Sequence, residues 1–137
     1  MPDKDYSHRD VTDKLGIKPG SIVALDEEAT PLDEALRRKV VERTGCPPAE
    51  QGEPADVVLV PLHAGVDAAT ALRAWRARIK PNGGIWLFTP KRGQPGYVDQ
   101  RELIGAGAKA GLVDNKSCSV DDTTSGMRFV IRRSDRP

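Results

Sequence analysis

The stretch from Asp56 to Pro90 limits the possible folds of this chain more than any other segment. It holds an uninterrupted apolar run over residues 57–60, a helical pattern that reaches Ile79, a glycine pair at 83–84 and a second apolar run over 85–88. Apolar runs without alternation are typical of strands that are buried on both faces, as in a parallel sheet. The stretch therefore predicts a strand–helix–strand unit.

The rest of the chain extends this unit in both directions. A first strand is predicted at 21–25, and a helix follows with Thr30 as its N-cap and Pro31 at its first position. After residue 90, the pattern predicts a helix over about 99–110, a strand over 112–120, a turn over 121–126 and a last strand over 127–132. The sum predicts an α/β fold: a small, Rossmann-like, three-layer domain whose mostly parallel sheet ends in an antiparallel hairpin.

Length and charge bound the organisation and the class of protein. The 137 residues suffice for one domain, which we assign to residues 14–133, between a mobile N-terminal arm (1–13) and a tail (134–137). The chain carries 21 basic and 20 acidic residues, which argues against a dedicated nucleic-acid arm or a membrane-surface protein. No apolar run approaches the roughly 18 residues of a membrane span, and the N-terminus lacks a hydrophobic signal region. We therefore expect a cytoplasmic protein with reduced cysteines.

The loop after the first strand lacks a feature that several nucleotide-binding folds need. Residues 15–25 and 79–87 resemble two strand entries of the class I S-adenosylmethionine-dependent methyltransferases, a family in which a glycine-rich loop follows the first strand. In this chain the segment from Asp26 to Pro31 contains two consecutive glutamates, a proline and no glycine. It also fails the dinucleotide fingerprint and the phosphate-binding P-loop. We therefore predict this scaffold without its cofactor site, and no cofactor.

Four residues stand near the predicted carboxyl ends of strands, where open α/β sheets bind their ligands. They are Asp26, His63, Lys91 and Asp121. His63 follows a buried strand, where it would serve as a base or as a hydrogen-bonded loop histidine. Lys91 with its neighbour Arg92 would hold an anion or lie in an exposed loop, and Asp121 would touch a cation or cap a turn. No cysteine or histidine lies at metal-ligand spacing, so no metal site is predicted.

Two cysteines, Cys46 and Cys118, are candidates for a redox switch, which requires their Cα atoms to approach within about 7 Å. Lys116 is two residues from Cys118 on the predicted strand and therefore on the same face. A lysine there would lower the pKa of the thiol and raise its reactivity. The alternative for Cys118 is a small buried apolar residue.

Basic side chains recur on three predicted elements. They lie on the first helix (Arg37, Arg38, Lys39, Arg43), the second helix (Arg73, Arg76, Arg78, Lys80) and the last strand (Arg128, Arg132, Arg133). If these faces converge, they form a surface for nucleic acid or an acidic partner. The alternative is a set of solvated faces whose aliphatic stems cover apolar surface.

Several segments, taken in order, are similar to the actinobacterial family of domain-of-unknown-function 3052. They are residues 14–20, 55–60, 83–86 with Pro90 and Lys91, 110–114, 118–121 and 125–130. The resemblance covers most of residues 14–133. It implies a small cytosolic bacterial protein without an assigned activity, so it supports the fold and leaves the function open.

Three hypotheses for the function follow. The first is a non-catalytic binding or regulatory protein, on a Rossmann-like scaffold without the glycine-rich loop, whose partner is another protein. The second is a redox-responsive transcriptional regulator that uses Cys46 and Cys118 as its switch and contacts nucleic acid through its arginine-rich faces. The third is a small enzyme with its site at the carboxyl ends of the strands. The sequence leaves the ligand and the oligomeric state open.

Overall fold

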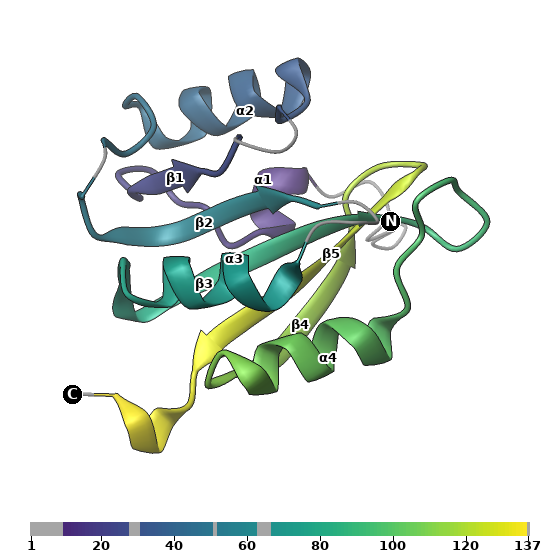
Figure 1. Cartoon of the computed structure of the whole chain (residues 1–137). Helices are drawn as coiled ribbons and strands as arrows, with labels where there is room; N and C mark the ends of the chain where they lie inside the picture. The colour runs from purple at the N-terminus through teal and green to yellow at the C-terminus, as the bar shows by residue number, and fades with distance from the viewer. Residues whose placement is uncertain (1–9, 28–30, 51, 63–66, 137) are drawn as a thin grey trace, which may run out of the picture.

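A five-stranded sheet with helices on both faces forms the body of the protein (Figure 1). The computed structural model describes residues 10–27, 31–50, 52–62 and 67–136. The helices are α1 (Val11–Lys14), α2 (Glu34–Thr44), α3 (Ala68–Arg76) and α4 (Gln100–Lys109), followed by the short 3-10 helix η2 (Arg133–Asp135). The strands are β1 (Val23–Leu25), β2 (Ala55–Pro61), β3 (Ile79–Pro90), β4 (Leu112–Ser119) and β5 (Thr124–Ile131).

The strands follow the order β1-β2-β3-β5-β4 across the sheet. β1, β2 and β3 pair in parallel, whereas β5 pairs antiparallel with both β3 and β4. Among these strands, β5 therefore runs against the other four. This arrangement confirms the predicted α/β fold with a mostly parallel sheet and an antiparallel end. The last strand of the chain is inserted between β3 and β4, so β4 forms the edge of the sheet.

The central strands β2 and β3 supply the most buried part of the sheet. Val58 and Leu59 on β2, and Ile85 and Trp86 on β3, expose 0% of their surface. β2 has a parallel neighbour on each side, and its alternate side chains enter the two cores on opposite faces of the sheet. Both faces of β2 are therefore shielded from water, which explains why its side chains are apolar without alternation.

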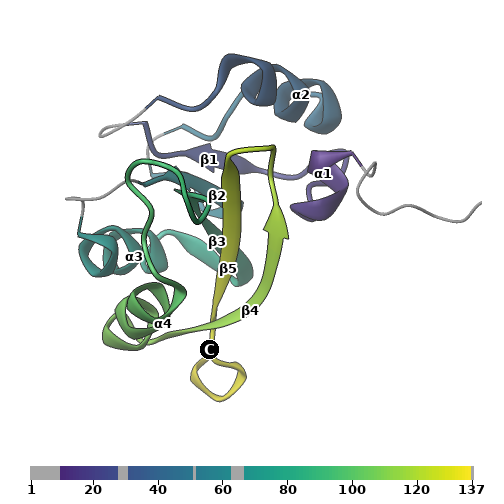
Figure 2. The same ribbon diagram turned by 90° about the vertical axis from the view of Figure 1, so that its right-hand side faces the viewer.

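Alternate side chains of the sheet form two separate cores. α1 and α2 cover one face, and α3 and α4 cover the other, as the two views show together (Figure 1, Figure 2). The first core joins Leu36 of α2 to Trp86 and Phe88 of β3. The second joins Leu103 of α4 to Phe129 of β5. α2 and α4 thus pack on the sheet through the apolar faces of their own sequences.

α2 begins later than predicted. The helix starts at Glu34, and its N-cap is Asp33, whose side chain accepts the N–H of Leu36 at 3.1 Å. Pro31 is therefore not its first residue, and the predicted N-cap Thr30 lies outside the described residues. Aspartate at the later position caps the helix because its carboxylate reaches the free N–H groups of the first turn.

The boundary between α3 and β3 also differs from the prediction. α3 ends at Arg76, and Ile79 belongs to β3, where it pairs with Ala55. The glycine pair at 83–84 lies inside this strand. A Cβ at Gly83 would lie 2.9 Å from the carbonyl oxygen of Ala55, so glycine permits the close approach of β2. Pairing with a strand far away in the sequence has overridden the local helical pattern.

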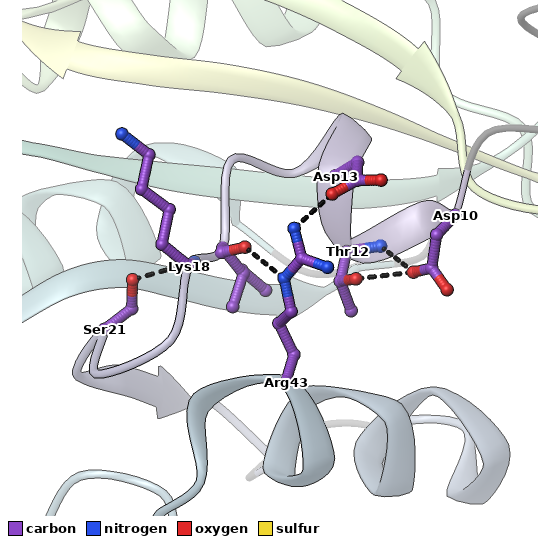
Figure 3. A network of polar contacts seen from close by, with 7 residues as sticks. Asp10, Thr12, Asp13, Lys18, Ser21 and Arg43 are labelled. Carbon is purple, nitrogen blue, oxygen red and sulfur yellow. Dashed lines mark hydrogen bonds and ion pairs between the residues drawn. The ribbon is translucent and has the colours of Figure 1, made fainter.

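Contacts with two elements fasten the segment before β1 to the rest of the fold. The guanidinium of Arg43 on α2 pairs with Asp13 and donates to the carbonyl of Ile17 at 3.1 Å (Figure 3). In the core, the indole N–H of Trp86 donates to the carbonyl of Leu15 at 3.0 Å. The entry to β1 is therefore held both by α2 and by β3.

The predicted N-terminal arm lies mostly outside the described residues, which begin at Asp10. Within its last four residues, the Asp10 carboxylate accepts the N–H of Thr12 at 2.8 Å and caps α1, and Thr12 is buried. At the other end, Arg136 donates to the carbonyl of Ile131 at 3.1 Å. The mobility of the arm and the boundaries of arm, domain and tail stay predictions.

Candidate functional site

The carboxyl ends of β1, β2, β3 and β4 lie at one edge of the sheet, the place where open α/β sheets bind ligands. Asp26 follows β1, Lys91 follows β3 and Asp121 lies in the turn between β4 and β5. His63 lies outside the described residues. β1 and β3 are separated by β2, so the two strands that Asp26 and Lys91 follow lie roughly 10 Å apart across the sheet. The edge therefore divides into two corners.

The first corner, which we call the acidic corner, consists of Asp26, Glu27 and Asp33. One carboxylate oxygen of Glu27 accepts the N–H of Leu32 at 3.0 Å, and the other pairs with Arg37 at 3.1 Å. Asp33 caps α2. A glycine-rich loop would offer such backbone N–H groups to a ligand. Here carboxylates of the chain itself occupy the N–H groups of Leu32 and Leu36.

Asp26 ties the acidic corner to α3. Its carboxylate accepts the indole N–H of Trp75 at 2.7 Å, and its backbone N–H donates to the carbonyl of Leu59 at 3.0 Å. Arg78 stacks on the Trp75 ring, with its guanidinium carbon 4.4 Å from the centroid. A cavity of about 360 Å³ lies beside Asp26, Trp75 and Arg78. Asp26 is thus a structural anchor at the wall of a cavity.

A smaller cavity of about 270 Å³ separates the acidic corner from the β4–β5 turn. It is mostly apolar and is lined by Leu32, Leu36, Pro61, Phe88, Pro90 and Val120, with Asp33 and Asp121 among its polar groups. Burial acts to raise the pKa of the Asp121 carboxyl, but hydrogen bonds from Thr123 and Thr124 outweigh it and hold this pKa below its usual value. The N–H of Thr123 donates to Asp121 at 2.8 Å. Asp121 therefore acts as the cap of its turn.

The second corner, which we call the basic corner, consists of Lys91, Arg92 and Arg101. All three line a cavity of about 760 Å³ between the end of β3 and the start of α4. The ammonium of Lys91 donates to the hydroxyl of Ser119 at 2.7 Å, and the Ser119 hydroxyl donates to the carbonyl of Asp121 at 3.2 Å. The structure thus brings Lys91 and Asp121 together and leaves Asp26 apart from them.

Sequence reasoning missed the importance of Arg101, Thr89 and Ser125 in the basic corner. Thr89 and Ser125 are paired across β3 and β5 and line the same cavity as Arg101. Arg101 lies ten residues after Lys91, on α4, and Ser125 belongs to a hairpin beyond that helix. A correct guess of which strands are neighbours was the one signal that would have joined them.

The two cysteines do not approach each other. Cys46 contacts the carbonyl of Ser21 just before β1, with the sulfur 3.8 Å from the oxygen, whereas Cys118 is on β4 at the opposite edge of the sheet. Four strand spacings put roughly 19 Å between these edges, beyond the reach of a disulfide. Burial raises the pKa of the Cys118 thiol and outweighs the charges of Lys14 and Lys116. The expected activation by Lys116 is therefore wrong, because desolvation is the stronger effect.

The basic residues of the helices do not form one surface. α2 and α3 lie on opposite faces of the sheet (Figure 1). Lys80 was predicted on the second helix but belongs to β3. Several of the predicted basic side chains also have structural partners: Arg37 pairs with Glu27, Arg43 with Asp13, and Lys80 with Asp56 at 3.1 Å. A nucleic-acid surface built from both helices is therefore not supported by their placement.

Two further properties concern the part of the chain that the structure describes. Within residues 10–27, 31–50, 52–62 and 67–136, no group of three or more His, Cys, Asp or Glu side chains is placed to hold a metal ion. Across the same ranges, each helix is too short or too polar to cross a bilayer.

Comparison with known sequences identifies relatives of this chain. A family model described as a protein of unknown function (DUF3052) matches residues 12–133. The uncharacterized protein Rv2239c of Mycobacterium tuberculosis is 31% identical over 127 residues, which covers 88% of this chain and 78% of that protein. The uncharacterized protein Mb2263c of Mycobacterium bovis matches with the same identity and coverage.

Comparison with solved structures finds methyltransferases. The mitomycin 7-O-methyltransferase MmcR matches with a TM-score of 0.54 and 14% identity, over 80% of this chain and 41% of its own. The O-methyltransferase NcsB1, in complex with S-adenosylmethionine, matches with a TM-score of 0.55 and 15% identity, over 81% and 41%. A putative methyltransferase from Thermoplasma acidophilum matches with a TM-score of 0.51 and 12% identity, over 88% of this chain and 71% of its own. These likenesses show a methyltransferase-like Rossmann fold, and this chain spans about two-fifths of the length of MmcR and NcsB1.

Proposed function

The chain belongs to the DUF3052 family, and from this membership and the chemistry of the sheet edge we propose a non-catalytic binding or regulatory protein that takes its ligand outside the β1–α2 loop. The observation that carries the proposal is the acidic corner. Glu27 occupies the N–H of Leu32 and pairs with Arg37, and Asp33 occupies the first turn of α2. The corner is thus satisfied by the chain itself.

The residues of the acidic corner do not fit the cofactor that the methyltransferase-like fold implies. S-adenosylmethionine carries a carboxylate and nucleotides carry phosphates, and both need unoccupied N–H donors at such a loop. Here an incoming anion would meet Glu27 and Asp33 at short range, and the two like charges would repel it. NcsB1 has been seen with S-adenosylmethionine. We expect this chain to share its sheet and not its cofactor.

The contacts of the candidate nucleophiles favour binding over catalysis. A general base must accept the proton of the nucleophile. The Ser119 hydroxyl instead donates a hydrogen bond to the backbone carbonyl of Asp121, and it accepts one from the ammonium of Lys91. Cys118 has a raised pKa, which keeps it in the less reactive thiol form. Neither arrangement activates a nucleophile.

In this proposal a small ligand binds at the sheet edge, and a protein partner responds to the ligand-bound form. The ligand enters at the open end of the sheet, on the side of β3, and the loaded form acts on a protein partner. A nucleic-acid partner is less favoured, because the basic residues of α2 and α3 lie on opposite faces of the sheet.

Calorimetric titration of the full chain with S-adenosylmethionine, S-adenosylhomocysteine and NAD tests the proposal. We expect no binding of any of the three. Micromolar binding of S-adenosylmethionine that a Glu27→Lys substitution strengthens would overturn it, because the acidic corner would then be a functioning cofactor loop. Micromolar binding that the substitution leaves unchanged would overturn it equally, since the cofactor would be held by another part of the edge.

A further inference from the structure

Three hydroxyl side chains form a row across the sheet beneath the start of α4. Thr89 on β3 pairs with Ser125 on β5, and Ser125 pairs with Ser119 on β4. Residues paired across strands point to the same face, and neighbours Leu87 and Met127 on that face belong to the core under α3 and α4. We call Thr89, Ser125 and Ser119 the hydroxyl row.

Thr89 is the buried member of the hydroxyl row. The residue is 5% exposed, and within the described ranges its hydroxyl makes no hydrogen bond. It lines both the cavity of about 760 Å³ at the basic corner and a second cavity of about 260 Å³ that includes Ser119. The hydroxyl is not among the fully buried side-chain atoms that lack a hydrogen bond, so it opens onto these cavities and its bonding capacity is available there. Thr89 is therefore placed to donate a hydrogen bond to a ligand that enters these cavities.

The cations beside the hydroxyl row lack carboxylate partners. Within the residues that the structure describes, Lys91, Arg92 and Arg101 make no ion pair. Asp99 is the one carboxylate in the lining of the larger cavity, and its side chain accepts the N–H of Arg101 as the cap of α4. Three positive charges thus face one negative charge. Arg92 lies over the ring of Tyr97, 5.9 Å from its centroid, and a side-chain hydrogen bond with Tyr97 raises the pKa of its guanidinium, so Arg92 stays charged beside the cavity.

We propose that the basic corner and the hydroxyl row bind the phosphate group of a small phosphomonoester. Arginine donates paired N–H groups that match phosphate oxygens, and lysine adds a further charge. The hydroxyls of Thr89 and Ser125 complete the set of donors on the floor of the cavity. Tyr97 and Val98 line its wall and supply the surface for the rest of the ligand. The inference rests on the proposed function and names the ligand class of that binding protein.

The backbone of α4 contributes little to this site. The N–H of Arg101 is taken by Asp99, and the N–H groups of Glu102 and Leu103 donate to the Asp99 carbonyl at 3.0 and 3.3 Å. Side chains therefore hold the phosphate. This assigns the affinity to residues that are easily replaced without disturbing the helix.

Calorimetry with the full chain at low ionic strength tests the proposal. The probes are inorganic phosphate, AMP, ribose 5-phosphate and unphosphorylated adenosine. We expect the phosphorylated probes to bind and adenosine not to bind, with affinity that falls as salt rises. Tighter binding of AMP than of ribose 5-phosphate would identify a nucleotide, and the reverse a sugar phosphate. Both results support the site.

Three variants locate the binding. Arg101→Gln removes one charged donor and should lower the affinity for the phosphorylated probes about tenfold or more. Thr89→Val keeps the shape of the side chain and removes the hydroxyl, so it should lower the affinity for the phosphorylated probes several-fold while the fold stays intact. Lys109→Gln makes the same charge change at the other end of α4 and should alter affinity less than about twofold.

The proposal is overturned if no phosphorylated probe binds, or if Lys109→Gln weakens binding as much as Arg101→Gln does. The first result would leave the proposed function standing, because it says nothing of the acidic corner. Conversely, binding of S-adenosylmethionine that Arg101→Gln leaves unchanged would refute the proposed function without touching the phosphate site. The two failures are therefore distinguishable.

Discussion

The acidic corner and the basic corner stand at the same edge of the same sheet, yet they treat charge in opposite ways. In the acidic corner, the carboxylates of Glu27 and Asp33 accept the backbone N–H groups of Leu32 and Leu36, so these two donors are already taken within the chain. In the basic corner, the charged groups of Lys91, Arg92 and Arg101 surround a cavity of about 760 Å³. The difference teaches that the position of a loop at the ligand-binding edge does not decide its role. What decides it is whether the donors there already have partners in the chain.

The largest effect is expected where α4 is seated against the sheet. A Cβ at Gly107 would lie 2.5 Å from the ring of Phe129, which is fully buried. Gly107→Ala should therefore cost about 2 kcal/mol of unfolding free energy, because α4 must move away. The same movement carries Arg101 off the basic corner and should weaken phosphate binding. Urea unfolding and calorimetry measure the two effects.

Gly105→Ala is the matched control for that substitution. Gly105 lies on the same helix, but nothing is within 4 Å of its added Cβ. We expect a gain in stability of about 0.5–1 kcal/mol from helix propensity and unchanged phosphate binding. Equal losses from the two alanines would show that packing against Phe129 does not position α4.

The next effect separates the two bonds that close the acidic corner. Glu27→Ala removes the acceptor of the Leu32 N–H and the partner of Arg37, so it should cost about 1 kcal/mol. Glu27→Gln keeps an acceptor for Leu32 and loses only the ion pair. Since the Arg37 side chain is 42% exposed, that loss should be about 0.3 kcal/mol. If glutamine proves as costly as alanine in urea unfolding, the Leu32 contact is not what holds the loop.

A smaller effect concerns the carboxylate inside the basic corner. Asp99→Asn keeps a side-chain acceptor for the N–H of Arg101, so α4 stays capped, and it removes a charge that opposes phosphate. Phosphate affinity measured by calorimetry should rise about twofold to threefold. A fall in affinity with unchanged helicity would contradict the electrostatic comparison of the corners.

The smallest effect is the pH dependence that Asp121 brings to the edge. Its folded-state pKa is held below the unfolded value, so its contribution to stability is present above an unfolded pKa of about 3.9. The contribution is lost as pH falls through the folded pKa. Asp121→Asn should therefore be less stable than the parent protein near neutral pH, and the gap should narrow below about pH 4. Urea unfolding across this range would contradict the assignment if the gap stays constant.

Local sequence rules predicted the elements well wherever a residue acts on its neighbours. Asp67 and Asp99 cap α3 and α4, and Gly45 ends α2 with a φ of 77°. The errors lie where a distant strand intervenes. Ile79 fits the helical pattern of the sequence but belongs to β3, because it pairs with Ala55 on β2. A periodic pattern records the preference of a segment and does not record the partner that overrides it.

The candidate site followed the same rule. Asp26, Lys91 and Asp121 were found because each follows a strand, and strand ends are visible in the sequence. Arg101, Thr89 and Ser125 were not found, because their neighbours lie on other strands or across a helix. The redox hypothesis needed a distance between Cys46 and Cys118, and that distance depends on the order of the strands.

The sequence by itself determined that this chain builds an α/β sheet with a loop after β1 that contains no glycine, because apolar runs, caps and glycines act over a few residues. Only the tertiary structure decided which charged side chains have partners within the chain. The insertion of β5 between β3 and β4 lines up Thr89, Ser125 and Ser119, and the seat of α4 on Phe129 places Arg101 above them. Such neighbours are brought together by packing, which sums contacts between residues far apart in the chain and therefore leaves no local trace.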